Sequence, residues 1–268
     1  MSTARRSVEH PDYRCYVLAG HNRADAIDIG RQMTEQDQTE SNRGAHKAVA
    51  ARRAVEFIRD GQVVGLGTGS TAAFAIKELG LLVNKGLRIR GVPTSKASTL
   101  LAEQCGIPLV DLNEVRKVDV TIDGADEIDP LFNMIKGGGG ALIREKLVAI
   151  VSGLEVIIVD APKLVAVLGN TVPVPVEVLQ FGWCLPESRL RELGCIPRLR
   201  QESGHAYESD NGNYILDCQF GPITDPAYLD KAIKQIPGVV ESGIFAGLAD
   251  RLIIGSDEGV EIRDRPDL

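Results

Sequence analysis

Hydrophobic and polar residues follow two different orders along the chain. Between residues 44 and 172, short apolar runs alternate with longer segments in which apolar residues recur every three or four positions. Apolar runs bounded by turns are typical of buried parallel strands, and the longer recurrence is typical of amphipathic helices. This alternation predicts an α/β fold with a mostly parallel sheet flanked by helices. The helices are expected at residues 45–61, 70–82, 96–106 and 140–153, and the strands at residues 62–67, 87–95, 107–112, 117–127 and 154–161.

Beyond residue 172 the order of elements changes. Strand, helix, strand, strand, helix and strand follow one another up to residue 245, and the Asn211-Gly212 pair is a strong hairpin signal. This succession is the split β-α-β motif of ferredoxin-like folds. The residues after Leu248 predict a closing hairpin that returns to the main sheet. The other elements are expected at residues 176–182, 186–194, 195–201, 214–220, 225–238 and 239–245.

We therefore expect three regions. Residues 1–43 hold few apolar residues and show no clear period, which predicts a disordered N-terminal tail. A transit peptide is disfavoured there because such peptides are poor in acidic residues. Residues 44–172 and 247–268 are expected to form the main α/β domain, and residues 173–246 a smaller α+β domain.

The composition narrows the class of protein. Of the 268 residues, 44% are hydrophobic and 25% are charged, which is typical of a soluble globular protein. The net charge of −7 and the aromatic content of 4% both disfavour nucleic acid as a partner. No apolar run reaches the length of about 18 residues that spans a membrane. The scattered cysteines and histidines lack metal-ligand spacing, so they predict reduced thiols in the cytoplasm and no metal site.

The first candidate for chemistry is the segment GLGTGST, residues 65–71, between a predicted strand and helix. Its glycines permit a tight turn, and the hydroxyls of Thr68, Ser70 and Thr71 lie beside the N–H groups of a helix N-terminus. Such a corner can hold an anion. A nucleotide is disfavoured because there is neither a G-x-G-x-x-G pattern nor a Walker lysine. An ordinary glycine turn with a helix cap explains the segment equally well.

Acidic residues follow the next strand. Asp123 and Asp126 lie in DGADE, at the carboxyl end of a predicted parallel strand, where open α/β sheets bind ligands. Taken alone, a solvated turn with two acids is the simpler interpretation. VDAPK, at the end of another strand, places Lys163 at the same edge, although a surface lysine would also fit.

The segment KGGGGALIREK, residues 136–146, is the least ordinary. Consecutive glycines are costly to order, so their backbone must approach something closely or adopt positive φ angles. Lys136 precedes the glycines, and Glu145 lies about two turns into the following helix. A solvated loop and an exposed charged helix face are the alternative. That alternative does not explain why four such segments meet at equivalent sheet edges.

Together, VGLGTGSTAAFAI, VTIDGADEID, MIKGGGGALIREK and VDAPK with PVPVEV resemble the type A ribose-5-phosphate isomerase family in order and spacing. The resemblance extends from about Ala45 to the C-terminus. It implies a Rossmann-like main domain, a ferredoxin-like lid, a homodimer or homotetramer, a cytoplasmic location and no cofactor. It also implies aldose–ketose isomerisation of a small sugar phosphate: D-ribose 5-phosphate and D-ribulose 5-phosphate interconvert through an enediolate, in the non-oxidative pentose phosphate pathway.

The resemblance also assigns residues. Glu145 matches the family's catalytic base, and Asp123, Asp126 and Lys136 complete the expected catalytic group. The expected substrate-binding residues are Lys47, Thr68, Gly69, Ser70, Thr71, Asp123, Gly124, Ala125, Asp126, Lys136, Gly137, Gly138, Gly139 and Lys163.

Two departures from the family pattern stand out. Pro162 occupies a position where many members have serine, so the loop that carries Lys163 is expected to differ. The N-terminal tail has no counterpart in the short bacterial members.

Three other functions remain open at this level. A glucosamine-6-phosphate deaminase of related fold would need a histidine at a strand end near the motifs, and none of the four histidines lies there. A 6-phosphogluconolactonase would be a further sugar-phosphate enzyme. A non-catalytic sugar-phosphate sensor domain would need an N-terminal helix-turn-helix, for which residues 1–43 are too short and too weakly patterned.

Overall fold

The computed structural model describes residues 35–266, with side chains from Asn42 onward. A six-stranded sheet in the order β15-β14-β6-β3-β1-β2 forms its centre, and every neighbouring pair is parallel except β14 with β15. The expected mostly parallel sheet and the returning hairpin are both confirmed. The strands are β1 (Val63–Leu66), β2 (Arg90–Pro93), β3 (Val120–Asp123), β6 (Glu155–Asp160), β14 (Arg251–Ser256) and β15 (Gly259–Asp264).

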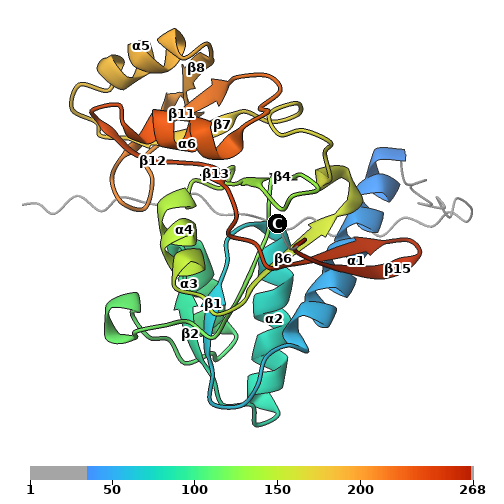
Figure 1. Cartoon of the computed structure of the whole chain (residues 1–268). Coiled ribbons are helices and arrows are strands. Elements are labelled where there is room, and N and C mark those ends of the chain that lie inside the picture. Colours follow the sequence, from blue (N-terminus) through green and yellow to red (C-terminus); the bar gives the residue numbers. More distant parts are fainter. Residues whose placement is uncertain (1–34, 267–268) are drawn as a thin grey trace, which may run out of the picture.

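Helices cover both faces of this sheet (Figure 1). Alternate residues of the central strands enter different clusters: Val156 and Ile158 pack with α1 and α2, whereas Ile157 and Val159 pack with Leu142 of α4. Because β1, β3 and β6 are buried along their whole length, their sequences are mostly apolar and do not alternate with polar residues, apart from Thr121 and the charged residues at the strand ends. The helices are α1 (Glu35–Val55), α2 (Ser70–Asn84), α3 (Lys96–Gln104) and α4 (Leu142–Ile150).

A second, antiparallel sheet lies above the main one in Figure 1, with the order β12-β7-β11-β8. Together with two helices it follows the β-α-β-β-α-β succession, which confirms the ferredoxin-like architecture. We call it the ferredoxin-like unit, and it has a hydrophobic cluster of its own. Its elements are β7 (Val174–Val178), α5 (Cys184–Glu192), β8 (Ile196–Leu199), β11 (Tyr214–Gln219), α6 (Pro226–Lys234) and β12 (Val239–Ser242), with a small hairpin of β9 (Gln201–Glu202) and β10 (His205–Ala206).

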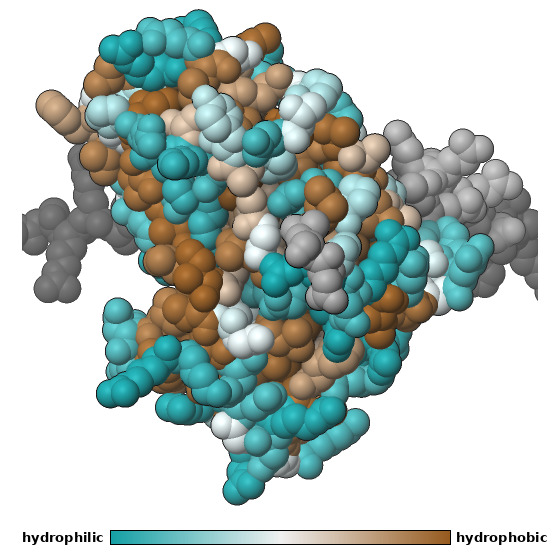
Figure 2. All heavy atoms as spheres, in the orientation of Figure 1, coloured by the Kyte–Doolittle hydropathy of each residue, from teal (hydrophilic) through white to brown (hydrophobic). Residues whose placement is uncertain are grey.

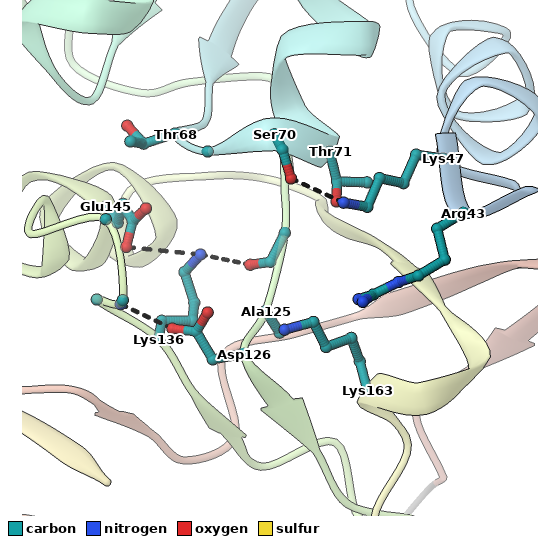
Figure 3. A pocket seen from close by; sticks show the side chains of 15 residues that line it. Arg43, Lys47, Thr68, Ser70, Thr71, Ala125, Asp126, Lys136, Glu145 and Lys163 are labelled. Atoms are coloured by element: carbon teal, nitrogen blue, oxygen red, sulfur yellow. Dashed lines mark hydrogen bonds and ion pairs between the residues drawn. The ribbon is translucent and has the colours of Figure 1, made fainter. Parts of the chain in front are cut away.

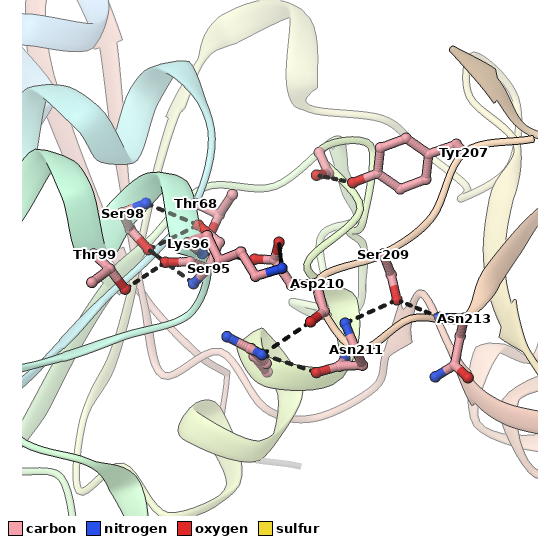
Figure 4. Close-up of polar contacts among 12 residues, drawn as sticks. Thr68, Ser95, Lys96, Ser98, Thr99, Tyr207, Ser209, Asp210, Asn211 and Asn213 are labelled. Atoms are coloured by element: carbon pink, nitrogen blue, oxygen red, sulfur yellow. Dashed lines mark hydrogen bonds and ion pairs between the residues drawn. The ribbon is translucent and has the colours of Figure 1, made fainter. Parts of the chain in front are cut away.

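The ferredoxin-like unit is tied to the main sheet by a turn at residues 209–213 (Figure 4). Asp210 accepts a hydrogen bond from the backbone N–H of Lys96 at the start of α3, at 2.6 Å. Asn211 accepts another from Arg144 of α4, at 3.0 Å. Buried Glu177 of β7 supports the turn by accepting a hydrogen bond from Ser209 at 2.6 Å. The turn therefore connects the ferredoxin-like unit to α3 and α4, which pack on the main sheet.

A three-stranded sheet that the sequence does not predict also joins them. It consists of β4 (Glu127–Ile128), β5 (Met134–Ile135) and β13 (Ile244–Phe245), all paired antiparallel. β4 and β5 have two residues each, too short to show a period of alternation, whereas β13 lies within the strand expected at residues 239–245.

Two expectations about elements are wrong. The first helix begins at Glu35 rather than near Gly44, so residues 35–43, which we assigned to the tail, are helical. The other residues assigned to the tail, 1–34, lie outside the described part. The strand expected at residues 107–112 is reduced to one bridge, between Leu109 and Gly91. Pro108 has no N–H to continue a ladder there. Within residues 35–266, no helix has the length and apolar character needed to cross a bilayer.

Candidate active site

A cavity of about 250 Å³ lies at the carboxyl ends of β3 and β6, beside the N-terminus of α2 (Figure 3). Residues from distant parts of the sequence meet there because parallel strands end at the same edge of the sheet. With one exception, Asp123, every residue expected at the site lines the cavity, and one residue that was not expected joins them. The lining residues are Arg43, Lys47, Thr68, Gly69, Ser70, Thr71, Gly124, Ala125, Asp126, Lys136, Gly137, Gly138, Gly139, Glu145 and Lys163.

The N-terminus of α2 forms one wall of the cavity. Gly69 precedes the helix with a φ of 96°, a conformation that favours glycine, and no side chain caps the helix. The first N–H groups of α2 therefore stay free for a ligand, and the helix dipole favours an anion there. The Lys47 ammonium donates to Ser70 Oγ at 2.9 Å, which places a cation at the same corner.

Asp123 lies beneath this corner and is 1% exposed. Its Oδ1 accepts hydrogen bonds from Thr68 N at 3.1 Å and from Gly124 N at 2.7 Å. A Cβ at Gly67 would lie 2.3 Å from the same oxygen, so only glycine fits there. Asp123 Oδ2 lies 3.1 Å from Lys136 Nζ. Asp123 does not line the cavity, and its contacts hold the loop and Lys136, so its contact with the substrate stays a prediction.

Lys136 is the buried cation of the site, at 3% exposure. Its Nζ lies between two carboxylates, 3.1 Å from Asp123 and 3.6 Å from Glu145, and it also donates to the carbonyl of Gly124. Burial alone would lower the pKa of Lys136, but the negative charges of Asp123 and Glu145 outweigh burial and raise the pKa above its ordinary value. Lys136 is therefore a permanent positive charge.

Glu145 is in the first turn of α4 and is 5% exposed. Burial raises its pKa to about 8, although the charge of Lys136 acts in the opposite direction. Its Oε2 has no hydrogen-bond partner among the described residues, and Lys136 at 3.6 Å is too far for a strong hydrogen bond. This oxygen is therefore free to accept a proton, and a raised pKa makes it a stronger base than an ordinary carboxylate.

The glycine segment forms the opposite wall. Gly137 and Gly140 have φ angles of 97° and 79°, which side chains disfavour. Gly138 N donates to Asp126 Oδ2 at 2.7 Å, and a Cβ on Gly138 would clash with that carboxylate. A Cβ on Gly140 would lie 2.1 Å from the hydroxyl of Tyr207. Positive φ angles and close approach together explain the run of glycines.

Three cationic side chains converge on the other end of the cavity in Figure 3: Arg43, Lys47 and Lys163. Lys163 lies on the short 3₁₀ helix η2 (Ala161–Lys163) that includes Pro162, so the departure at residue 162 still leaves Lys163 at the cavity. The Nε of Arg43 donates to the fully buried carboxylate of Asp160 at 2.7 Å.

The sequence interpretation missed Arg43 because we assigned it to the tail. Its spacing of four residues from Lys47 was the available signal, since residues i and i+4 share a helix face.

A buried base beside a buried cation, with further cations across the cavity, defines an α/β enzyme site for a small anionic substrate. Among the described residues, no group of three or more His, Cys, Asp or Glu side chains is arranged to hold a metal ion. The positive groups that the described residues place at the site are lysine, arginine and backbone N–H groups.

Comparison with known proteins identifies the family. Residues 90–259 match the model of the ribose 5-phosphate isomerase A (phosphoriboisomerase A) family. The ribose-5-phosphate isomerase A of Gloeobacter violaceus is 54% identical over 217 residues, which cover 81% of this chain and 94% of that protein. The chain belongs to the ribose 5-phosphate isomerase A family.

Solved structures agree. The ribose 5-phosphate isomerase of Plasmodium falciparum has a TM-score of 0.81 at 38% identity and covers 84% of this chain and 100% of its own. A D-ribose-5-phosphate isomerase in complex with phospho-erythronic acid has the same TM-score at 42% identity, with the same coverage. These likenesses confirm both the family and the α/β fold class.

Proposed function

We propose that this chain interconverts D-ribose 5-phosphate and D-ribulose 5-phosphate through an enediolate intermediate. The observation that carries the proposal is the pairing of Glu145 Oε2, buried and without a hydrogen bond, with Lys136 Nζ at 3.6 Å. A base and a fixed positive charge at that separation suit the removal of a proton next to a carbonyl, where negative charge appears on oxygen.

Glu145 takes the proton from C2 of the open-chain aldose. The C2–H electron pair forms the C1–C2 double bond, and the carbonyl electrons move to O1, which gives the enediolate. Lys136 and the N–H groups of the glycine segment stabilise this oxyanion. The proton of the O2 hydroxyl passes to O1, and Glu145 then returns a proton to C1 as the C2 oxygen becomes the ketone. One carboxyl group can serve both carbons because they are adjacent.

The two aspartates have different positions, which supports different roles. Asp126 lines the cavity and accepts the hydrogen bond from Gly138, so it can orient sugar hydroxyls and assist ring opening. Asp123 is buried below the cavity, and its Oδ2 lies 3.1 Å from Lys136 Nζ, so it can hold the ammonium group in place. We assign Asp126 to the substrate and Asp123 to the orientation of Lys136.

We place the phosphate of the substrate at the N-terminus of α2. Free helix N–H groups and the Ser70 hydroxyl would donate to its oxygens, as in other anion sites at helix N-termini. Lys47, Lys163 and Arg43 supply positive charge around the same point. The chain carries a net charge of −7, so these local cations must overcome the repulsive field of the whole protein.

Three finer statements belong to this proposal. The division into an α/β catalytic domain and a ferredoxin-like lid, with boundaries near residues 173 and 246, is supported by the separate hydrophobic clusters. A homodimer or homotetramer is supported by hydrophobic side chains gathered around α4 in Figure 2, where Leu147 and Ile150 are 51% and 59% exposed. A cytoplasmic location is supported by the scattered cysteines.

The test is the formation of ketose from ribose 5-phosphate by the purified chain, with unphosphorylated ribose as the comparison substrate. We expect turnover of the phosphorylated sugar and at least about 10²-fold lower kcat/KM for ribose, because the cationic end would be unoccupied. No ketose from ribose 5-phosphate would refute the proposal.

A further inference from the structure

The carbonyl groups of the glycine segment are held from the ferredoxin-like unit. Arg200, which directly follows β8, donates through Nη1 to the carbonyls of Gly137 at 2.9 Å and Gly138 at 3.2 Å. The Tyr207 hydroxyl makes a longer contact of 3.5 Å with the carbonyl of Gly139. The segment that forms a wall of the cavity therefore has its successive carbonyls turned toward the antiparallel sheet.

The direction of a carbonyl fixes the direction of the next N–H group. In a planar trans peptide the C=O and N–H bonds point to opposite sides. Holding the Gly137 carbonyl thus points Gly138 N to the other side, where it meets Asp126 at 2.7 Å. Holding the Gly138 carbonyl in the same way turns the N–H of Gly139 away from Arg200. Gly139 lines the cavity, and its N–H has no hydrogen-bond acceptor among the described residues.

Glycine makes such a clamp necessary. A run of glycines adopts many φ and ψ combinations at little cost, so it does not hold an N–H in one direction by itself. Preorganised donors stabilise a developing charge because they need no reorientation during the reaction. The segment has one hydrogen bond of its own, from Gly140 N to the Gly137 carbonyl at 2.9 Å, and the rest of its order depends on neighbouring groups.

Arg200 is itself fixed in place. Asp217 of β11 binds it at two points, with Nη2 to Oδ1 at 2.5 Å and Nε to Oδ2 at 3.0 Å. The guanidinium lies 5.7 Å from the centre of the Tyr207 ring, and the Arg200 side chain is 15% exposed. A two-point bond between a planar guanidinium and a carboxylate sets orientation as well as position. The third nitrogen, Nη1, is thereby aimed at the glycine carbonyls.

We propose that Arg200 is a positioning residue for the isomerase reaction: it holds the peptide planes of residues 137–139 so that the Gly139 N–H donates to the enediolate oxygen. The proposal rests on the proposed function. It makes the ferredoxin-like unit part of the oxyanion site, although none of its residues lines the cavity.

The test compares Arg200→Ala and Arg200→Lys with Arg198→Ala, which removes an exposed arginine from β8 two positions earlier. Arg200→Ala should lower kcat by about 10- to 100-fold with KM within about 3-fold, since the loss falls on transition-state charge. The kcat of Arg200→Lys should lie between those of Arg200→Ala and the wild type, because an ammonium group cannot bond to Asp217 in the two-point geometry. Arg198→Ala should match the wild type.

Binding of two inhibitors separates positioning from general damage. Phospho-erythronic acid carries a carboxylate far from its phosphate and so resembles the charged enediolate, whereas inorganic phosphate occupies the cationic end alone. Arg200→Ala should weaken phospho-erythronate by about the factor lost in kcat and leave the affinity for phosphate unchanged. Thermal melting of each variant shows that the protein is folded at the assay temperature.

The outcomes are distinct. An inactive wild type would refute the proposed function and leave the inhibitor comparison to judge Arg200. An active wild type, with Arg200→Ala keeping kcat within about 2-fold or losing phosphate and phospho-erythronate equally, would overturn the positioning role. If Arg200→Ala does not fold, the same kcat and inhibitor-affinity ratios are measured for Arg200→Lys and Asp217→Asn. Each of these variants loosens the positive group at residue 200 without removing all of its hydrogen bonds.

Discussion

At one end of the cavity the charges of Lys136 and Glu145 are 3% and 5% exposed, whereas at the other end the Arg43 side chain is 43% exposed and works with Lys47 and Lys163. The buried end contains both signs of charge in close contact. The open end contains three cations beside the cavity, one of which, Arg43, is also bonded to the buried carboxylate of Asp160. One cavity thus combines two electrostatic environments.

The difference indicates how the work of the site is divided. Charges removed from water interact strongly, and a lost partner leaves the other charge uncompensated. Exposed cations are screened and individually contribute little. We therefore expect substitutions at the buried end to lower kcat by a large factor. Substitutions at the open end should raise KM, and each should have a small effect because several cations contribute to binding.

The largest effect is expected for Glu145→Gln, which removes the base and keeps the shape. Turnover should fall by about 10²- to 10⁴-fold, the usual contribution of a positioned base. Binding of inorganic phosphate, measured by calorimetry, should remain. Glu103→Gln, at an exposed position of α3, is the matched control. If Glu145→Gln retained nearly full activity, the base would have to be another group.

Lys136→Met should come next. Without the ammonium, negative charge on the substrate oxygen loses its main partner, and kcat should fall by about 10²-fold. The variant should also melt at a lower temperature than the wild type, and more so at alkaline pH, where Asp123 and Glu145 would ionise without compensation. Lys77→Met, at an exposed position of α2, provides the comparison. Unchanged kcat would contradict the assignment of Lys136.

The pH profile is expected to report Glu145. Burial raises its pKa to about 8, and a base acts only when deprotonated, so kcat/KM should rise with pH up to about 8 and then level off. The substrate phosphate titrates near pH 6, below this range. A profile flat between pH 7 and 9 would show that Glu145 has an ordinary pKa.

Stability provides an independent check of the same pKa. A carboxyl group with a raised pKa in the folded state destabilises the fold as pH rises from its ordinary pKa of 4.5 to about 8. The melting temperature of Glu145→Gln relative to the wild type should therefore increase over this range. A constant difference would count against the raised pKa.

At the open end, Lys47→Ala and Lys163→Ala should each raise KM by about 10-fold, equal to about 1.4 kcal/mol, with kcat within about 3-fold. Added salt should raise the KM of the wild type more than that of each variant, because the variants have lost a screened charge. Lys85→Ala, exposed at the end of α2, is the control. A fall in kcat without a change in KM would contradict this role.

The smallest effect is expected from chelation. EDTA should leave turnover unchanged, because lysine and arginine can supply the positive charge and the described residues offer no metal-holding group. Loss of activity that a divalent ion restores would show that the reaction needs a metal ion.

The sequence predicts the parallel sheet, the ferredoxin-like unit and most of the site for one physical reason. Buried strands read as apolar runs, and the carboxyl ends of parallel strands meet at one edge. Motifs that follow different strands, such as those of Thr68 and Asp126, are therefore expected to meet at one site. This expectation requires no knowledge of interatomic distances. Glycine runs with nearby charge add the second signal.

The missed features depend on properties that a linear pattern does not show. The polar start of α1 has no apolar stripe, so Arg43 was assigned to the tail. The different burial of Asp123 and Asp126 depends on which way the chain turns after β3. The bonds from Arg200 to Gly137 join residues 63 positions apart. Such contacts arise from the packing of the two sheets and appear only in three dimensions.

The central claim is that Glu145 moves a proton at the buried end of the cavity. Its most direct test is the conversion of ribose 5-phosphate in deuterium oxide by the wild type and by Glu145→Gln, followed by NMR of the product. The account predicts ribulose 5-phosphate with deuterium at C1 from the wild type, and neither ketose nor exchange from the variant. Ketose formation by Glu145→Gln at the wild-type rate, or exchange of deuterium into C1 by this variant at the wild-type rate, would contradict it.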